Sequence, residues 1–248
     1  MRSAVEFLVD SNLGLPVDEK PWSDILAELG IATTLTNDLE ELDRSVARHE
    51  PDIVFMPISD FHRLLATGDT YYRGLALVTS KLTGSTKLPS VLIVRDDDPA
   101  DGIKDLRGAP FGYINASCSS SYFCPAIVLA TLGENFRDFF DLRETAPWQG
   151  QIDAVIDRTV RATMVVEDIW RATPSNARAT KIIGRYDNAT GAVVVVGEDI
   201  DGRVAAGLLD ALVTWQPAPD ALFGPFTRYR DEDVAAFYAD MERLPAGF

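Results

Sequence analysis

The densest group of polar side chains in the sequence lies between Asn115 and Ser121, directly before an apolar stretch that predicts a helix reaching Leu132. The first N–H groups of a helix have no acceptor within the helix, and the helix dipole places partial positive charge beside them. Hydroxyl and amide groups at that place help to bind an anion or a carboxylate. In the alternative, structural interpretation one serine caps the helix and the others line a turn. The predicted ligand contacts here are Asn115, Ser117, Cys118, Ser119, Ser120 and Ser121.

A second set of polar residues follows two predicted strands in the first quarter of the chain. Asp10, Ser11 and Asn12 follow the strand expected over residues 4–9, and Ser59 follows the strand expected over 52–57. Ligands of open α/β sheets bind outside the carboxyl ends of the strands. We therefore expect these four residues on the ligand side of the sheet, with an ordinary role in a turn as the alternative for each group.

Two further candidates come from the second half of the chain. Glu167 follows the strand expected over residues 162–166 and is paired with Asp168. Paired carboxylates bind a cation or an ammonium group, or act as a general base, whereas the alternative is a pair of solvated loop residues. Trp148 offers an aromatic face for stacking on a ligand, although such a side chain is more often part of a core.

The motifs of common catalytic and metal sites are absent from the sequence. It contains two histidines without the spacing of a metal-ligand pair, and it has no Walker A, G-x-G-x-x-G or G-x-S-x-G motif. We therefore expect no metal and no cofactor, and the sequence assigns no catalytic residue.

The two cysteines, Cys118 and Cys124, are too few for a Cys-based zinc site. On one helix they would lie about 9 Å apart along the axis, which is too far for a disulfide. We expect two semi-buried free thiols. A reactive Cys118 at the helix N-terminus is the alternative.

The charge of the chain limits its partners. Lys and Arg number 23 against 38 Asp and Glu, which gives the 248 residues a net charge of −15. Nucleic acid and anionic membranes are repelled by such a surface, so we expect neither as a partner. The longest apolar runs, such as 193–196, fall far short of the about 20 residues of a membrane span. Because acids such as Asp10, Asp60 and Glu167 would penalise a dianion, the expected ligand is a small carboxylate-bearing or zwitterionic molecule rather than inorganic phosphate.

The elements that must position these residues alternate between strands and helices. Continuous apolar runs such as 53–56 are typical of strands covered on both faces. The order strand, helix, strand, helix, strand at the start predicts a mostly parallel sheet between helices, and hence an α/β fold. Strands are expected over 4–9, 32–35, 52–57, 76–79, 91–94, 110–114, 162–166 and 192–196.

Several segments also carry a resemblance to a known family. They are Ser90-Val91-Leu92-Ile93-Val94-Arg95, Asp105-Leu106-Arg107-Gly108, Asn115 through Ser121 with Pro125, and Gln151-Ile152-Asp153-Ala154-Val155. With them, the stretch from Leu88 to Val196 resembles the phosphonate/phosphite-type substrate-binding proteins of ABC transporters, which have the type 2 periplasmic-binding fold. Residues 52–57 are similar to the ligand loop in the first lobe of that family.

This resemblance implies two doubly wound α/β lobes, joined by two crossing strands, with a ligand cleft between them. The crossings would fall near 91–95 and 193–197. Lobe one would then comprise residues 1–94 plus 195–248, and lobe two residues 95–194. The implied function is binding of a small organic anion or a phosphonate-like molecule in an ABC-transporter-like system, with an ABC permease as the protein partner.

A second hypothesis from a different class stays open at this point. A cytoplasmic enzyme on the same bilobed fold, lyase-like and similar to menaquinone-pathway enzymes, would act on a small carboxylate. No signal peptide is recognisable at the start of the sequence, which favours the enzyme, whereas no acid–base constellation is recognisable either, which favours the binding protein. We expect a cytoplasmic location if Met1 is the native start, and a periplasmic or extracellular one if a signal peptide was trimmed.

Overall fold

The structure is a computed structural model that describes residues 5–20, 22–218, 221–245 and 248. Residue 4, the expected start of the first strand, and Met1, on which the expected location depends, lie outside the described residues. Within those ranges no helix is both long enough and apolar enough to cross a membrane. The chain forms two compact units, unit 1 with Met1–Thr86 and Gly191–Asp231, and unit 2 with Lys87–Thr190 and Glu232–Phe248.

Unit 1 is built on a six-stranded sheet in the order β11-β4-β10-β3-β1-β2. Its strands β1 to β4 all run in one direction, because β1 pairs in parallel with β2 and β3 while β10 pairs antiparallel with both β3 and β4. The carboxyl ends of these four strands therefore lie at one edge. The strands are β1 (Val5–Asp10), β2 (Ile31–Thr36), β3 (Ile53–Pro57), β4 (Tyr72–Val78), β10 (Ala192–Gly197) and β11 (Phe226–Arg228).

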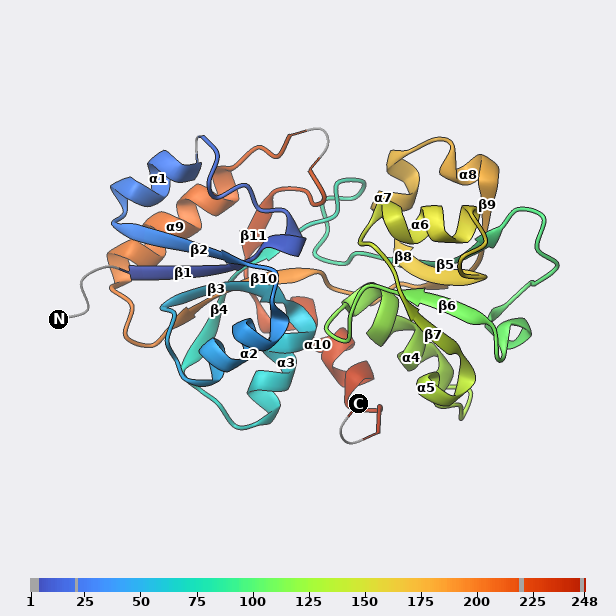
Figure 1. The fold of residues 1–248 in the computed structure, drawn as a ribbon. Helices are drawn as coiled ribbons and strands as arrows, with labels where there is room; N and C mark the ends of the chain where they lie inside the picture. The colour runs from blue at the N-terminus through green and yellow to red at the C-terminus, as the bar shows by residue number, and fades with distance from the viewer. Residues whose placement is uncertain (1–4, 21, 219–220, 246–247) are drawn as a thin grey trace. The chain divides into compact units, whose positions relative to one another are not determined.

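Helices cover both faces of this sheet, as Figure 1 shows, with α1 and α9 on one face and α2 and α3 on the other. The core strands explain this arrangement: the side chains of β3 and of Val193 to Val196 in β10 are all buried, so each of these strands needs apolar cover on two sides. The helical elements of the unit are η1 (Ser11–Leu13), α1 (Trp22–Glu28), α2 (Leu39–Ala47), α3 (Ile58–Ala66) and α9 (Gly202–Thr214).

Unit 2 is built on a five-stranded sheet in the order β7-β6-β8-β5-β9. Strand β6 pairs in parallel with β7 and β8, and β5 pairs antiparallel with β8 and β9. The carboxyl ends of β6, β7, β8 and β9 therefore lie at one edge, together with the beginning of β5. The strands are β5 (Ser90–Arg95), β6 (Pro110–Tyr113), β7 (Asp141–Glu144), β8 (Ala162–Val166) and β9 (Thr180–Tyr186).

The sheet of unit 2 also has helices on both faces, with α6, α7 and α8 on one and α4 and α5 on the other (Figure 1). The C-terminal helix α10 (Asp231–Met241) belongs to this unit apart from its first residue. The other helical elements are η2 (Ile103–Leu106), η3 (Ser119–Phe123), α4 (Cys124–Ala130), α5 (Phe136–Phe139), α6 (Gln149–Ile156), α7 (Glu167–Ala172) and α8 (Asn176–Ala179).

The expected fold class is confirmed: two α/β units each place a mixed sheet between helices. The alternative interpretations of Ser59 as a turn residue and of Glu167 as a solvated loop residue were wrong. Ser59 lies in the first turn of α3 and Glu167 begins α7, so neither is a residue of an irregular turn or loop. Strands β7, β9 and β11 were not expected at all.

The division into units differs from the expected lobes of 1–94 plus 195–248 and of 95–194. Strand β5 hydrogen-bonds to β8 on one side and β9 on the other, so it lies inside the sheet of unit 2. Strand β10 is likewise an interior strand of unit 1. The chain passes from unit 1 to unit 2 shortly before β5 and returns to unit 1 just before β10. After Asp231 it passes to unit 2 again, so the last residues belong to unit 2.

Candidate functional site

The candidates in unit 1 gather at the carboxyl edge of its sheet. Strands β1 and β3 are neighbours with Val9 opposite Phe55, so the residues that follow them share that edge. Ser11 is exposed and Asn12 is half-buried, whereas Asp10 and Ser59 are buried.

Asp10 has a structural role at this edge. Its Oδ1 atom accepts hydrogen bonds from the backbone N–H of Asn12 at 2.9 Å and from the Asn12 side-chain amide at 3.0 Å. Burial raises the pKa of the Asp10 carboxyl above 3.8, and the hydrogen bonds from Asn12 only partly offset this effect. The turn interpretation therefore describes Asp10 well. Ser11 and Asn12, which follow Asp10, are at least partly exposed to solvent and are therefore accessible to a ligand.

The serine-rich segment of unit 2 follows β6 and folds back on itself. The Ser121 hydroxyl accepts a hydrogen bond from the backbone N–H of Ile114 at 3.1 Å, and the Asn115 side chain accepts one from the backbone N–H of Ser117 at 2.9 Å. Ser121 and Ser117 are both buried. The side chains of Ser121 and Asn115, two of the predicted ligand contacts, thus stabilise the turn itself.

A continuous helical run begins directly after this turn, first as the π-helical turn η3 and then as α4. Cys118 precedes it: its Sγ atom accepts a hydrogen bond from the backbone N–H of Ser121 at 3.5 Å and lies 3.4 Å from the Ser120 hydroxyl. Ser119, the first residue of the run, is half-buried. The helix start therefore combines hydroxyl groups with the N–H groups of a first turn, which is a suitable arrangement for an anion.

Trp148 and Glu167 belong to the same edge of unit 2, because they follow β7 and β8 respectively. Trp148 is half-buried, has a positive φ of 58° and stands directly before α6. Glu167 is buried, and its carboxylate forms ion pairs with Arg171, at 2.7 Å, and with Arg185. Two guanidinium groups thus compensate the charge of Glu167 inside unit 2.

Arg185 is a functional candidate that the sequence analysis missed. It lies in β9 opposite Val91, close to the edge that carries the serine-rich segment, and it also pairs with Asp187. Its strand, Thr180–Tyr186, gave little signal in the sequence, because Lys181, Gly184 and Arg185 interrupt the apolar residues.

The two cysteines are free thiols in different surroundings. Cys124 is fully buried and donates to the Ser90 hydroxyl at 3.7 Å, and burial raises the pKa of its thiol. Cys118 is half-buried at the start of the helical run. No group of three or more His, Cys, Asp or Glu side chains among the described residues is arranged to hold a metal ion.

Solved structures of other proteins share this fold. The PhnD1 protein of Prochlorococcus marinus, whose structure contains methylphosphonate, superposes with a TM-score of 0.75 at 10% identity, over 97% of this chain and 98% of that chain. A binding protein component of an ABC phosphonate transporter from Pseudomonas aeruginosa gives 0.71 at 16% identity, over 96% and 85%. The periplasmic aliphatic sulphonate binding protein SsuA of Escherichia coli gives 0.66 at 15% identity, over 98% and 86%. At these identities the likeness shows the fold alone, which is that of the type 2 periplasmic-binding proteins.

The sequence itself identifies the family. A family model described as "ABC transporter, phosphonate, periplasmic substrate-binding protein" matches residues 26–227, which is most of the chain. The chain therefore belongs to this family of substrate-binding proteins, as the resemblance of the serine-rich segment and its neighbours predicted. Among curated proteins, no sequence matches this one significantly.

Proposed function

We propose that the chain binds a small organic oxyanion of the phosphonate or sulfonate type and presents it to an ABC permease. The observation that carries this proposal is the helix start at Cys118–Ser121, which offers hydroxyl and N–H donors at the carboxyl edge of unit 2. In unit 2 the proposal assigns ligand contacts to Asn115, Ser119, Ser120 and Trp148. In unit 1 it assigns them to Ser11, Asn12 and Ser59.

Charge compensation supports an anion of this type. The sequence alone favours a carboxylate, because acidic residues near the site would repel a dianion. However, Glu167 is paired with Arg171 and Arg185, and Asp60 is paired with Arg63. These pairs cancel much of the expected repulsion, since each carboxylate already faces a positive charge. The solved relatives that bind methylphosphonate or aliphatic sulphonates favour the same ligand class.

The proposal includes a place of action and a partner. Because the family is described as periplasmic and as part of an ABC transporter, we propose that this chain acts in the periplasm beside a permease. Fractionation of the source cells, with the mature N-terminus read by mass spectrometry, tests the location. Recovery of the protein in the cytoplasmic fraction alone would contradict this part of the proposal.

Calorimetry tests the ligand class. Methylphosphonate, methanesulfonate and acetate are titrated into the intact protein, and we expect the first two to bind more tightly. The double variant Ser119→Ala/Ser120→Ala should weaken binding by about 1–3 kcal/mol, because hydrogen bonds to a charged group are lost. Ser175→Ala, at an exposed position before α8 where the side chain makes no capping hydrogen bond, is the matched control and should bind normally.

Three outcomes would count against the proposal. Unchanged affinity in the double variant with the fold intact would show that this helix start does not hold the ligand. Tighter binding of acetate than of the other two anions would restore the carboxylate expectation. Conversion of a bound ligand to a new compound, followed by NMR, would favour the enzymatic hypothesis instead.

A further inference from the structure

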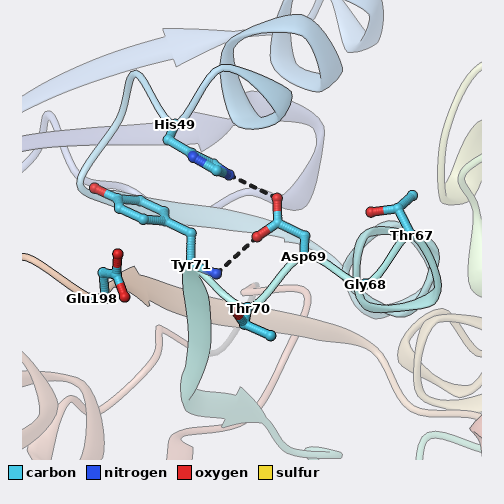
Figure 2. Close-up of a pocket in the computed structure, with 7 residues that line it drawn as sticks. All are labelled: His49, Thr67, Gly68, Asp69, Thr70, Tyr71 and Glu198. Carbon is cyan, nitrogen blue, oxygen red and sulfur yellow. Dashed lines mark hydrogen bonds and ion pairs between the residues drawn. The ribbon is translucent and has the colours of Figure 1, made fainter.

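A separate recess of about 430 Å³ lies in unit 1, at the edge of the sheet opposite to the candidate site. Its position follows from the topology: His49 precedes β3, Tyr71 precedes β4, and Glu198 follows the antiparallel strand β10. Figure 2 shows how these side chains surround the recess. It is lined by His49, Thr67, Gly68, Asp69, Thr70, Tyr71 and Glu198.

One wall of this recess is held firmly in place. The rings of His49 and Tyr71 stack with centroids 4.3 Å apart and an interplanar angle of 16°. Tyr71 also packs against the backbone at Gly197, since a Cβ atom at Gly197 would lie 2.7 Å from its ring. Little conformational freedom is therefore lost when a ligand meets this wall, which favours binding.

Asp69 is oriented by two hydrogen bonds in the same wall. Its Oδ2 atom lies 2.7 Å from Nε2 of His49, and its Oδ1 atom accepts from the backbone N–H of Tyr71 at 2.8 Å (Figure 2). A carboxylate oxygen has a second lone pair, so each oxygen of Asp69 is able to accept another hydrogen bond. Asp69 is thus fixed in orientation, and both of its oxygens keep the capacity to accept a hydrogen bond from a ligand.

Two further lining residues offer acceptor oxygens. Glu198 is an exposed carboxylate, and Thr67 donates its hydroxyl proton to the Leu64 carbonyl at 2.7 Å, which leaves its oxygen to accept. None of the seven lining residues is Lys or Arg. Such a lining suits a positively charged group with several N–H donors, and the overall charge of −15 attracts small cations.

We propose that this recess binds a small alkylammonium compound, with Asp69 and Glu198 as its carboxylate acceptors. A bare metal ion fits less well, because no three metal-ligating side chains of the described residues converge. The recess shares no residue with the proposed anion site, so a negative result for one proposal does not contradict the other.

Calorimetry with 1,4-diaminobutane as the probe, at about 0.15 M salt to suppress diffuse attraction, tests this inference on the intact protein. We expect saturable binding, and no binding of the neutral analogue 1,4-butanediol. Glu198→Gln, which keeps the shape of the side chain, should weaken binding at least fivefold. Glu28→Gln removes an exposed carboxylate of the same unit at the end of α1, outside the recess, and should leave binding unchanged.

NMR locates the binding, because the chain has only two histidines. The ring signals of His49 should shift on titration with the diamine, and those of His62 should not. Absence of saturable binding, equal binding of the diol, or an equal loss of affinity in Glu28→Gln would each overturn the inference. The Ser119→Ala/Ser120→Ala variant should still bind the diamine.

Discussion

The Sγ atom of Cys118 accepts a hydrogen bond from the backbone N–H of Ser121 at 3.5 Å. Cys118 therefore stands where Ser, Thr, Asp or Asn usually caps a helix. A thioether or thiol sulfur is a weaker acceptor than a hydroxyl oxygen. The helix start on which the proposed function depends is thus capped by a weak acceptor.

Replacing this cap tests its contribution to stability. Cys118→Ser should raise the free energy of unfolding by about 0.5–1 kcal/mol, because a hydroxyl caps the helix better than a thiol. Cys118→Ala, which has no acceptor, should lower it by a similar amount. Urea unfolding followed by circular dichroism measures both changes. A serine variant less stable than the alanine variant would show that the sulfur is held for its packing rather than as a cap.

The two thiols should differ sharply in reactivity. Burial raises the pKa of the Cys124 thiol, and thiolates are the reactive form, so a native chain should be labelled quickly at Cys118 only. Ellman's reagent at pH 8 should report one fast thiol, and a second after denaturation. Cys118→Ser should abolish the fast phase, whereas Cys124→Ser should keep it. Equal labelling rates at the two positions in the native protein would contradict the buried environment of Cys124.

The ion pair of Glu167 with Arg185 provides a test of charge compensation. Arg185→Ala leaves Glu167 with Arg171 as its remaining partner. We expect unfolding to become easier by about 1–3 kcal/mol, because a buried carboxylate loses a charged hydrogen-bond donor. Phosphonate affinity should also fall, since a carboxylate with one positive partner instead of two repels an anion more strongly.

A double variant separates these effects. Adding Glu167→Gln to Arg185→Ala should recover most of the lost phosphonate affinity, as expected of two residues that act on each other. Arg178→Ala, at an exposed position of α8 in the same unit, is the control and should change neither property. If the double variant binds phosphonate no better than Arg185→Ala alone, then Arg185 contacts the ligand directly instead of neutralising Glu167.

The central strands could be predicted from the sequence because their apolar runs have one physical explanation. Residues 53–56 and 193–196 are continuous apolar runs, and the structure buries both as interior strands of one sheet. Strand β9 was missed because it is an edge strand whose apolar residues are interrupted by Lys181, Gly184 and Arg185. An edge strand is covered on fewer sides, so its sequence carries a weaker signal.

The candidate site was predictable as a segment, but the partners of its side chains were not. The hydroxyls between Asn115 and Ser121 stand out in the sequence, yet only the fold shows that Ser121 is turned inward onto Ile114. Long-range pairs explain the rest of the difference. Glu167 and Arg185 are 18 residues apart in the sequence. Their contact results from the pairing of strands in the sheet, and no local pattern in the sequence indicates it. Such pairs reduce the repulsion of a dianion, and for this reason the formal charges alone pointed to a carboxylate ligand.

Gly74 in β4 is a position where a single methyl group should be costly. A Cβ atom there would lie 2.3 Å from Cγ of Tyr229, whose backbone N–H is held by the Leu75 carbonyl at 3.0 Å. Gly74→Ala should therefore lower the free energy of unfolding by about 1–3 kcal/mol through overpacking. Gly102→Ala has no atom within 4 Å of its new Cβ and an extended φ of −168°, so it should be neutral in the same urea titration. Equal stability of the two variants would show that Tyr229 moves aside freely.

The ion pair of Asp98 with Arg161 should make the stability of unit 2 depend on pH. Two hydrogen bonds of 2.9 Å from Arg161 reach the two oxygens of Asp98 and hold the pKa of this carboxyl below 3.8, although its partial burial opposes them. A lowered pKa in the folded state stabilises the fold at a pH above the unfolded value near 3.8, and this contribution disappears as the pH falls through the folded value. Asp98→Asn should therefore cost about 1–2 kcal/mol at pH 7, and the difference from the parent protein should shrink steadily below pH 4. Urea unfolding of both proteins between pH 7 and pH 2.5 measures this difference. A constant gap over that range would mean that the amide disrupts packing and that the charge of Asp98 contributes nothing.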